Sequence, residues 1–133
     1  MPNPNPNLTP RFLDKLRVEE YDSKNWILIS EFRYVSAVFY DSRKPEARGG
    51  LIVVPDGFIT DFSSVPRIPF AFWLAGDTGR KAGVIHDFLY DHHLGGRQPA
   101  DEVFLEALRA EDVSRWRAQQ MFLGVRFFGG SHW

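Results

Sequence analysis

The chain has 133 residues, of which 44% are hydrophobic and 25% charged, a balance typical of one folded domain that buries its own core. Its 16 Lys and Arg residues nearly balance its 17 Asp and Glu residues, so a formal charge of −1 gives no overall attraction to nucleic acid or to an anionic membrane. The absence of cysteine excludes disulfides and thiol nucleophiles, and the longest apolar runs are too short to cross a membrane.

Proline and asparagine alternate at the start of the chain. Such a segment has little apolar surface to bury, and it predicts a flexible leader over residues 1–11 ahead of a single domain over residues 12–133. The N-terminus also lacks the basic and then apolar order of a signal peptide. We therefore expect a soluble protein that is made in the cytoplasm.

Apolar and polar residues alternate over Leu13–Phe39, as in β-strands with one buried face. The polar stretch Asp22–Asn25 interrupts this alternation and predicts the turn of an antiparallel hairpin. Further strands are expected at residues 32–36, 51–54 and 58–60, and Pro55-Asp56-Gly57 is a strong turn signal between the last two.

After residue 76 the apolar residues recur at helical spacing. A first helix is expected from an N-cap at Asp77 or Thr78 to Gly95-Gly96, a second opens around Pro99, and a third follows Ser114. Strands thus precede helices along the chain. This order predicts an α+β fold, with a small antiparallel β-sheet from the N-terminal half packed against about three C-terminal helices.

A group of titratable residues interrupts the apolar face of the first helix. His86 and Tyr90 share one face because they are four residues apart, and the short linker that follows should return the second helix antiparallel, with Asp101 near both. A carboxylate there could hold one imidazole nitrogen and stabilise the imidazolium when the other nitrogen takes a proton from water. His86, Asp101 and Tyr90 are therefore the candidate catalytic residues.

Asp87 lies on a neighbouring face and is a candidate ligand for a hard cation, together with Asp61 and the carbonyls of the loop after it. In that loop Ser63, Ser64 and Arg67 are expected to support the site. Either serine could instead only bond nearby backbone N–H groups. A serine nucleophile is disfavoured because the sequence lacks the small residues of the tight strand-to-helix turn that exposes such a serine. A zinc site is disfavoured because no second histidine is close enough to His86.

Each of these residues also has a purely structural interpretation. His86 can be a core histidine with satisfied hydrogen bonds, and Asp101 can complement the dipole at the start of a helix. His92 and His93 near a helix C-terminus are expected to interact mainly with its dipole. Arg109, Arg115, Arg117 and Arg126 lie among acidic residues, which favours a solvated face and no nucleic-acid site.

Several short motifs follow one another in a fixed order along the chain. They are Val54-Pro55, Gly57-Phe58, Thr60-Asp61, Ser64, Pro66-Arg67, His86-Asp87-Phe88-Leu89-Tyr90, Ala100-Asp101 and Phe127-Phe128-Gly129. Over about residues 13–133 this order resembles a small family of bacteriophage- and prophage-encoded proteins that share a domain of unknown function. The resemblance implies synthesis in the host cytoplasm and association with a virion, with phage structural proteins or an envelope substrate as partners. It implies no activity and no oligomeric state.

The helix pair over about residues 78–110 also resembles phospholipase A2, particularly its short bacterial members. The matching pattern is His86-Asp87-x-x-Tyr90 followed by Asp101. The resemblance implies that His86 is the general base for a water, Asp87 a calcium ligand, Asp101 the residue that orients His86, and Tyr90 a hydrogen-bond donor to Asp101. The glycine-rich calcium loop and the disulfides of that enzyme class have no counterpart here, and the spacing from His86 to Asp101 is shorter.

Two hypotheses follow. In the first, the protein is a metal-assisted hydrolase of an ester, an amide or an envelope component, and His86 activates water. In the second, it is a non-enzymatic virion, tail or assembly-associated protein whose His-Asp-Tyr network only ties the helices together.

Overall fold

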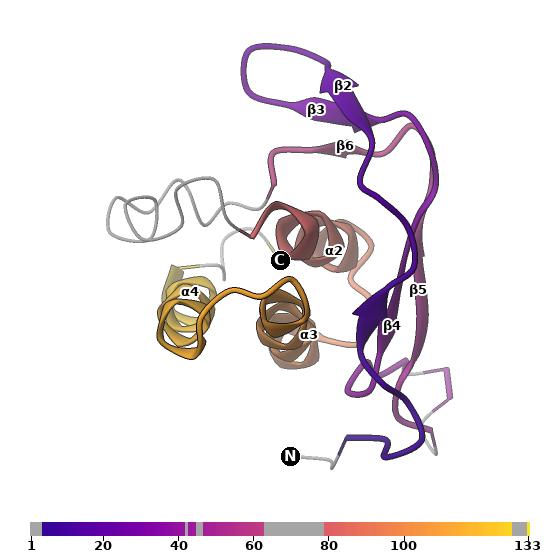
Figure 1. Cartoon of the computed structure of the whole chain (residues 1–133), viewed down its shortest axis with the longest axis vertical. Coiled ribbons are helices and arrows are strands. Elements are labelled where there is room, and N and C mark those ends of the chain that lie inside the picture. The colour runs from indigo at the N-terminus through magenta and orange to yellow at the C-terminus, as the bar shows by residue number, and fades with distance from the viewer. Residues whose placement is uncertain (1–3, 42, 45–46, 63–78, 129–132) are drawn as a thin grey trace.

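The computed structural model describes residues 4–41, 43–44, 47–62, 79–128 and 133. Within these residues it confirms the predicted α+β fold, with strands in the N-terminal half and three helices after them (Figure 1). The strands are β1 (Arg11–Phe12), β2 (Val18–Glu20), β3 (Trp26–Leu28), β4 (Phe32–Ser36), β5 (Gly50–Val54) and β6 (Ile59–Thr60), and the helices are α2 (Arg80–Asp91), α3 (Arg97–Ala110) and α4 (Arg115–Phe128).

The described strands form two three-stranded antiparallel sheets, with the orders β1-β4-β5 and β2-β3-β6. The predicted hairpin is β2 and β3, and Asp22 Oδ1 closes its turn by accepting the backbone N–H groups of Lys24 and Asn25, both at 2.8 Å. After the turn at Gly57 the chain pairs with β3 and not with β5. The backbone N–H of Leu28 in β3 donates to the Phe58 carbonyl, and the Leu28 carbonyl accepts the N–H of Gly57. As a result β6 joins the second sheet.

The helices follow the predicted order and differ at their ends. The first begins at Arg80 with Gly79 as its N-cap, so the prediction of Asp77 or Thr78 as the cap was wrong. Gly79 has a φ of 83°, a conformation that glycine adopts more easily than a residue with a side chain. Ser114 accepts the backbone N–H of Arg117 at 3.3 Å at the start of α4, as predicted for a capping residue.

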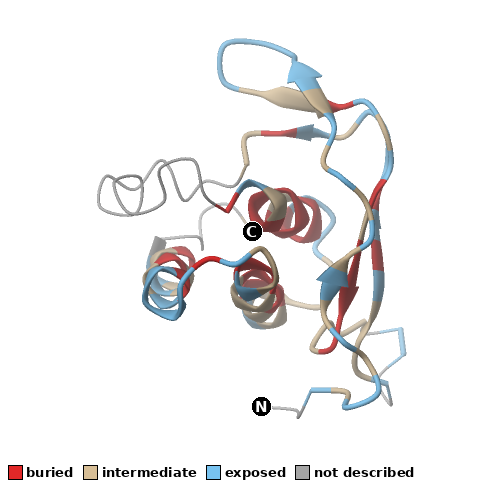
Figure 2. Ribbon diagram, in the orientation of Figure 1, coloured by how far each residue is buried: buried red, intermediate tan, exposed pale blue. Residues whose placement is uncertain are grey.

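The helices pack on one side of the β1-β4-β5 sheet (Figure 1). Helix α3 contacts both α2 and α4, while α2 also contacts β5 and β6. The residues buried between these layers are red in Figure 2, and the largest include Phe32, Tyr34, Ile85, Leu89 and Phe104. The site described below lies in this core, where α2 faces α3.

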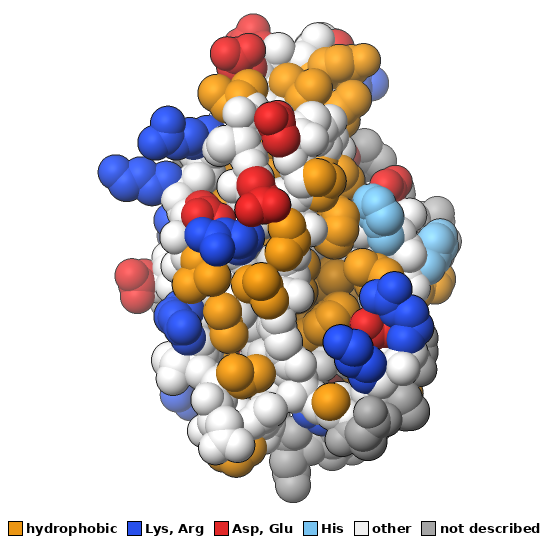
Figure 3. Space-filling model, turned by 90° about the vertical axis from the view of Figure 1, so that its right-hand side faces the viewer, with side chains coloured by type: hydrophobic (Ala, Val, Ile, Leu, Met, Phe, Trp, Pro, Cys, Tyr) orange, Lys and Arg blue, Asp and Glu red, His pale blue; other side chains and the backbone are white. Residues whose placement is uncertain are grey.

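The outer face of the sheets carries exposed apolar side chains mixed with charged ones (Figure 3). Leu51 and Val53 are exposed on β5, an edge strand, whereas Ile52 and Val54 between and after them are buried. This alternation is the period-two pattern of a sheet with one buried face. None of the described helices is long and apolar enough to span a bilayer.

The segment predicted to be a flexible leader makes specific contacts after residue 3. The backbone N–H of Asn5 donates to the Ala37 carbonyl at 2.8 Å, and the Asn5 side chain donates to the Arg48 carbonyl at 2.9 Å. Strand β1 begins at Arg11, so the ordered fold includes the last residue assigned to that leader.

Candidate functional site

The centre of the site is a hydrogen bond between α2 and α3. His86 Nε2 lies 2.8 Å from Asp101 Oδ1, and the two side chains are 1% and 0% exposed. His86 is on the buried face of α2, and Asp101 lies in the second turn of α3. The short connection after α2 brings α3 back alongside it. The pairing expected from the four-residue spacing and the short linker is therefore present.

Asp101 accepts hydrogen bonds from three residues on two other helices, α2 and α4. Tyr90 donates its hydroxyl to Oδ1 at 2.6 Å, so His86 and Tyr90 share one carboxylate oxygen. Arg126 of α4 donates from Nη1 to Oδ2 at 2.9 Å. A buried carboxylate is stable only when its charge is paired and its oxygens are bonded, and this arrangement meets both conditions.

The surroundings determine which of these groups is charged. Burial by itself raises the pKa of Asp101, but the hydrogen bonds from His86, Tyr90 and Arg126 outweigh it, and the net pKa lies below its ordinary value. Burial lowers the pKa of His86, and Asp101 only partly opposes this shift. At neutral pH the site therefore holds an ionised Asp101 and a neutral His86.

These protonation states assign the tautomer of His86. An ionised carboxylate can only accept hydrogen bonds, so Nε2 must carry the ring proton that is donated to Asp101. The basic lone pair of the neutral ring is then on Nδ1. Chemically, the arrangement can accept a proton at Nδ1 and stabilise the resulting imidazolium through Asp101.

Aromatic rings enclose the imidazole. The ring centroid of His86 lies 4.1 Å from that of Tyr90 and 4.7 Å from that of Phe104. Trp133 packs edge-on against Tyr90, with the centroids 5.1 Å apart, and against His93 at 4.8 Å. The contacts of His86 with Tyr90 and Phe104 fix the orientation of the imidazole ring.

The structure places Asp87 on the other side of α2, as expected, against the end of β6. The Thr60 hydroxyl donates a hydrogen bond to Asp87 Oδ2 at 2.6 Å, and Asp61 directly follows Thr60 in the chain. Close packing holds this end of β6, because a Cβ added at Gly83 would overlap the backbone carbonyl of Phe62. Among the described residues, no group of three or more His, Cys, Asp or Glu side chains could hold a metal ion. The calcium site therefore stays a prediction.

The remaining predicted residues are outside this network or outside the described part of the chain. Ser63, Ser64 and Arg67 lie outside the described residues. His92 is exposed at the end of α2, where Nδ1 lies 3.1 Å from the Phe88 carbonyl oxygen. His93 has a left-handed backbone with a φ of 51° and contacts Trp133.

Sequence reasoning missed two residues of the site. Arg126 was assigned to a solvated face, yet it binds Asp101 and its side chain is only 30% exposed. Thr60, the partner of Asp87, was placed in an expected strand and in the Thr60-Asp61 motif but was given no role in the site. The signal available for Arg126 was the need of a buried Asp101 for a cation. No local pattern pointed to Thr60.

Comparison with known proteins identifies the family of the chain and no individual relative. No curated protein and no solved structure matches it. One family matches over residues 26–125, a range that includes His86, Asp87, Tyr90 and Asp101. Since this range covers most of the chain, the protein belongs to the family described as "Protein of unknown function (DUF1353)".

Proposed function

We propose that this protein is a hydrolase of bacteriophage or prophage origin in which His86 activates a water molecule. The observation that carries the proposal is the 2.8 Å hydrogen bond between His86 Nε2 and an ionised Asp101. The substrate class that suits such a base is an ester, an amide or a component of the cell envelope. The phage setting rests on the motif resemblance alone.

In the proposed step His86 is the general base. A water gives its proton to Nδ1 as its oxygen attacks the substrate carbonyl, which becomes a tetrahedral oxyanion, and Asp101 stabilises the positive charge on the ring. When the oxyanion collapses, the C–O bond of an ester or the C–N bond of an amide breaks, and the leaving alcohol or amine takes the proton back from Nδ1. Asp101 is a positioning residue: it fixes the tautomer and orientation of His86. Arg126 and Tyr90 act through Asp101 by keeping it ionised and fixed in place.

The proposal includes calcium near Asp87. The Asp87 carboxylate and the Thr60 hydroxyl meet there, and Asp61 follows Thr60 in the chain. Their side chains offer only oxygen ligands, which suit a hard cation. Bound calcium would supply a positive charge close to the substrate carbonyl. Asp87 and Asp61 would hold it, and Thr60 would orient Asp87.

The activity is tested by an ester-hydrolysis screen of the purified protein, with phospholipid and short-chain esters as substrates. We expect turnover that His86→Ala abolishes. His92→Ala is the matched control, because His92 is exposed on the same helix and is not bonded to Asp101. Circular dichroism should show that both variants are folded. Turnover that His86→Ala leaves unchanged would refute His86 as the base.

The metal is tested separately by thermal melting with and without calcium. We expect calcium to raise the melting temperature of the wild-type protein, because a ligand that binds only the folded state stabilises it. Asp87→Asn should lose this effect, whereas Asp91→Asn, an exposed change on the same helix, should keep it. A wild-type protein that does not respond to calcium would remove the metal from the proposal and leave the His86 test unaffected.

A specific observation favours a second function. His86 and Asp101 are almost fully buried, which is the expected state of a network that only joins helices in a non-enzymatic virion or assembly protein. In that case His86→Ala should destabilise the fold, the protein should show no hydrolysis, and it should cosediment with virions. A His86→Ala protein as stable as wild type would argue against this function.

A further inference from the structure

Helix α4 carries a stripe of large apolar side chains that face solvent. Trp116, Leu123 and Phe127 are 59%, 37% and 79% exposed. They are spaced by seven and four residues, which are about two turns and one turn of an α-helix, so they lie on one face over roughly 16 Å. We call Trp116, Leu123 and Phe127 the outer stripe.

The outer stripe is additional to the face that α4 uses for folding. Ala118, Met121 and Val125 are buried and occupy the opposite side of the helix, where α4 packs on α3. The exposed side of α4 is pale blue in Figure 2. Burial in the core therefore does not account for the large apolar residues of the outer stripe. A row of such residues on one exposed face usually marks an interaction surface.

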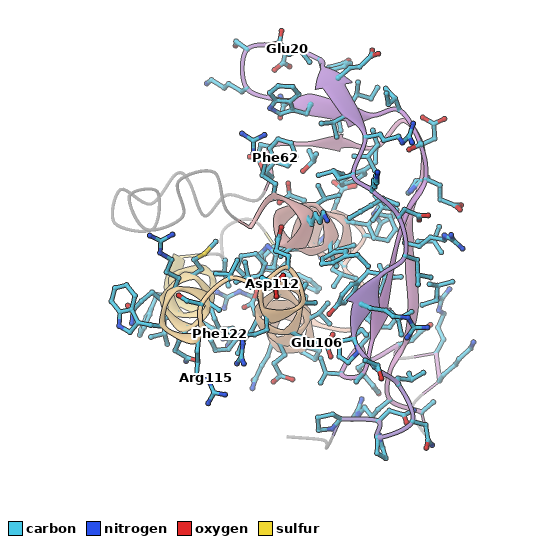
Figure 4. All side chains as sticks on the ribbon, viewed as in Figure 1. Glu20, Phe62, Glu106, Asp112, Arg115 and Phe122 are labelled. Carbon is cyan, nitrogen blue, oxygen red and sulfur yellow. The ribbon has the colours of Figure 1, made fainter. Side chains whose placement is uncertain are left out.

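The charge of α4 indicates what that surface contacts. The helix contains three arginines and no acidic residue, although the whole chain has a formal charge of −1. Arg115 and Arg117 are both exposed, and neither makes a side-chain hydrogen bond or ion pair with the described residues. Arg115 projects away from the molecule in Figure 4.

The positions of the arginines relative to the outer stripe add to this argument. At about 100° per residue, Arg115 and Arg126 lie on one flank of the stripe and Arg117 lies on the other. An apolar stripe with arginines on both sides is the pattern of a helix that lies in the surface of a membrane. There the apolar residues enter the acyl boundary while the arginines reach anionic headgroups.

We propose that α4 is a peripheral membrane-binding helix that docks on an anionic lipid bilayer through Trp116, Leu123 and Phe127, with Arg115 and Arg117 contacting the headgroups. An anionic bilayer satisfies the arginines and the apolar stripe together. A nucleic acid would satisfy only the arginines and would leave the outer stripe in water. The inference does not depend on whether His86 is catalytic.

The test is flotation of the full-length protein with vesicles. One set contains phosphatidylcholine with phosphatidylglycerol, and the other contains phosphatidylcholine alone. We expect the wild-type protein to float with the anionic vesicles and to be released as the salt concentration rises. Each of Arg115→Gln and Arg117→Gln should lower the partition coefficient by about fivefold, as expected for one arginine near an anionic surface.

A second pair of variants tests the apolar part. Trp116→Ser with Phe127→Ser should lower the partition coefficient by about tenfold or more. Leu51→Ser with Val53→Ser is the matched control, because these side chains are also exposed and apolar but lie on the outer face of β5. The control should bind like wild type. All of these changes are at exposed sites, and circular dichroism should confirm that the variants fold.

Three results would overturn the proposal. Equal binding of the wild-type protein to neutral and anionic vesicles would remove the role of the arginines. Equal loss of binding in the α4 and β5 variants would remove the role of the outer stripe. Binding to duplex DNA that depends on Arg115 and Arg117, without any binding to vesicles, would assign α4 to nucleic acid.

Discussion

Arg126 of α4 holds Asp101 of α3 through a 2.9 Å hydrogen bond between Nη1 and Oδ2, on the side of the carboxylate away from His86. The carboxylate thereby links all three described helices, because His86 and Tyr90 bind its other oxygen from α2. A change at Asp101 should accordingly affect the packing of each helix. It should also affect the protonation of His86.

Asp101→Asn should be strongly destabilising. The substitution removes the negative charge that pairs with Arg126. It also replaces one accepting oxygen of Asp101 by an NH2 group, which cannot accept the hydrogen bonds offered there. Removing one partner of a buried ion pair costs about 3–5 kcal/mol, so we expect a loss of that order in the free energy of unfolding measured in urea at pH 7.

Glu102→Gln provides the control for this measurement. Glu102 is the next residue of α3, is only half-buried, and is contacted by Gln98 at 3.4 Å. Its substitution should change the free energy of unfolding by less than about 0.5 kcal/mol. Similar effects of the two changes would contradict the central role of Asp101 in the network.

His86 should make the stability of the protein depend on pH. Because burial lowers its pKa, the folded protein binds fewer protons at His86 than the unfolded chain, whose histidine has a pKa of about 6.5. The stabilising contribution is therefore complete above that value. It is lost as the pH falls below it toward the lower folded pKa, by up to about 1.4 kcal/mol per pH unit.

The measurement is urea unfolding of wild type and His86→Gln between pH 7.5 and 5.5. The glutamine can still donate to Asp101 but does not titrate, so the variant should lose less stability than wild type over this range. The exposed His92 and His93 are present in both proteins and cancel in the difference. Parallel curves for the two proteins would show that His86 is not held neutral by burial.

Tyr90→Phe isolates the shared oxygen of Asp101. The change removes the 2.6 Å hydrogen bond to Oδ1 and keeps the ring that packs on His86 and Trp133. A hydrogen bond to a charged group contributes about 1.5–3 kcal/mol, and we expect a loss in that range in urea unfolding. Tyr21→Phe, at an exposed tyrosine, should have no measurable effect. A loss at Tyr90 as small as that at Tyr21 would mean that Asp101 is satisfied without this donor.

The sequence predicted the parts of the site that depend on local geometry. Helical spacing placed His86 and Tyr90 on one face, and the short linker returned Asp101 to them, because both relations follow from helix geometry and chain length. Arg126 could not be placed in this way. It is 25 residues from Asp101, and the contact depends on how α4 packs on α3.

The arrangement of the strands shows the same difference. The pattern over residues 18–28 predicted the β2-β3 hairpin, because the turn residues lie between the two strands. The pairing of β6 with β3 was not predicted. It depends on long-range backbone hydrogen bonds of Leu28 with Gly57 and Phe58, which no local pattern encodes.

Gly83→Ala should separate α2 from the end of β6. A Cβ at this position would overlap the backbone carbonyl of Phe62, and a backbone neighbour cannot move as a flexible side chain can. Alanine favours the helix itself, so any loss of stability must come from this overlap, and overpacking of this kind costs about 1–3 kcal/mol.

Gly57→Ala is the comparison for this prediction. Gly57 has open space around it but a φ of 89°, so its expected cost of about 1 kcal/mol comes from backbone strain alone. Since Thr60 and Asp61 immediately precede Phe62, Gly83→Ala should also weaken any calcium-dependent rise in melting temperature, while Gly57→Ala should not. A Gly83→Ala protein as stable as wild type would show that the contact between α2 and the end of β6 is looser than the structure indicates.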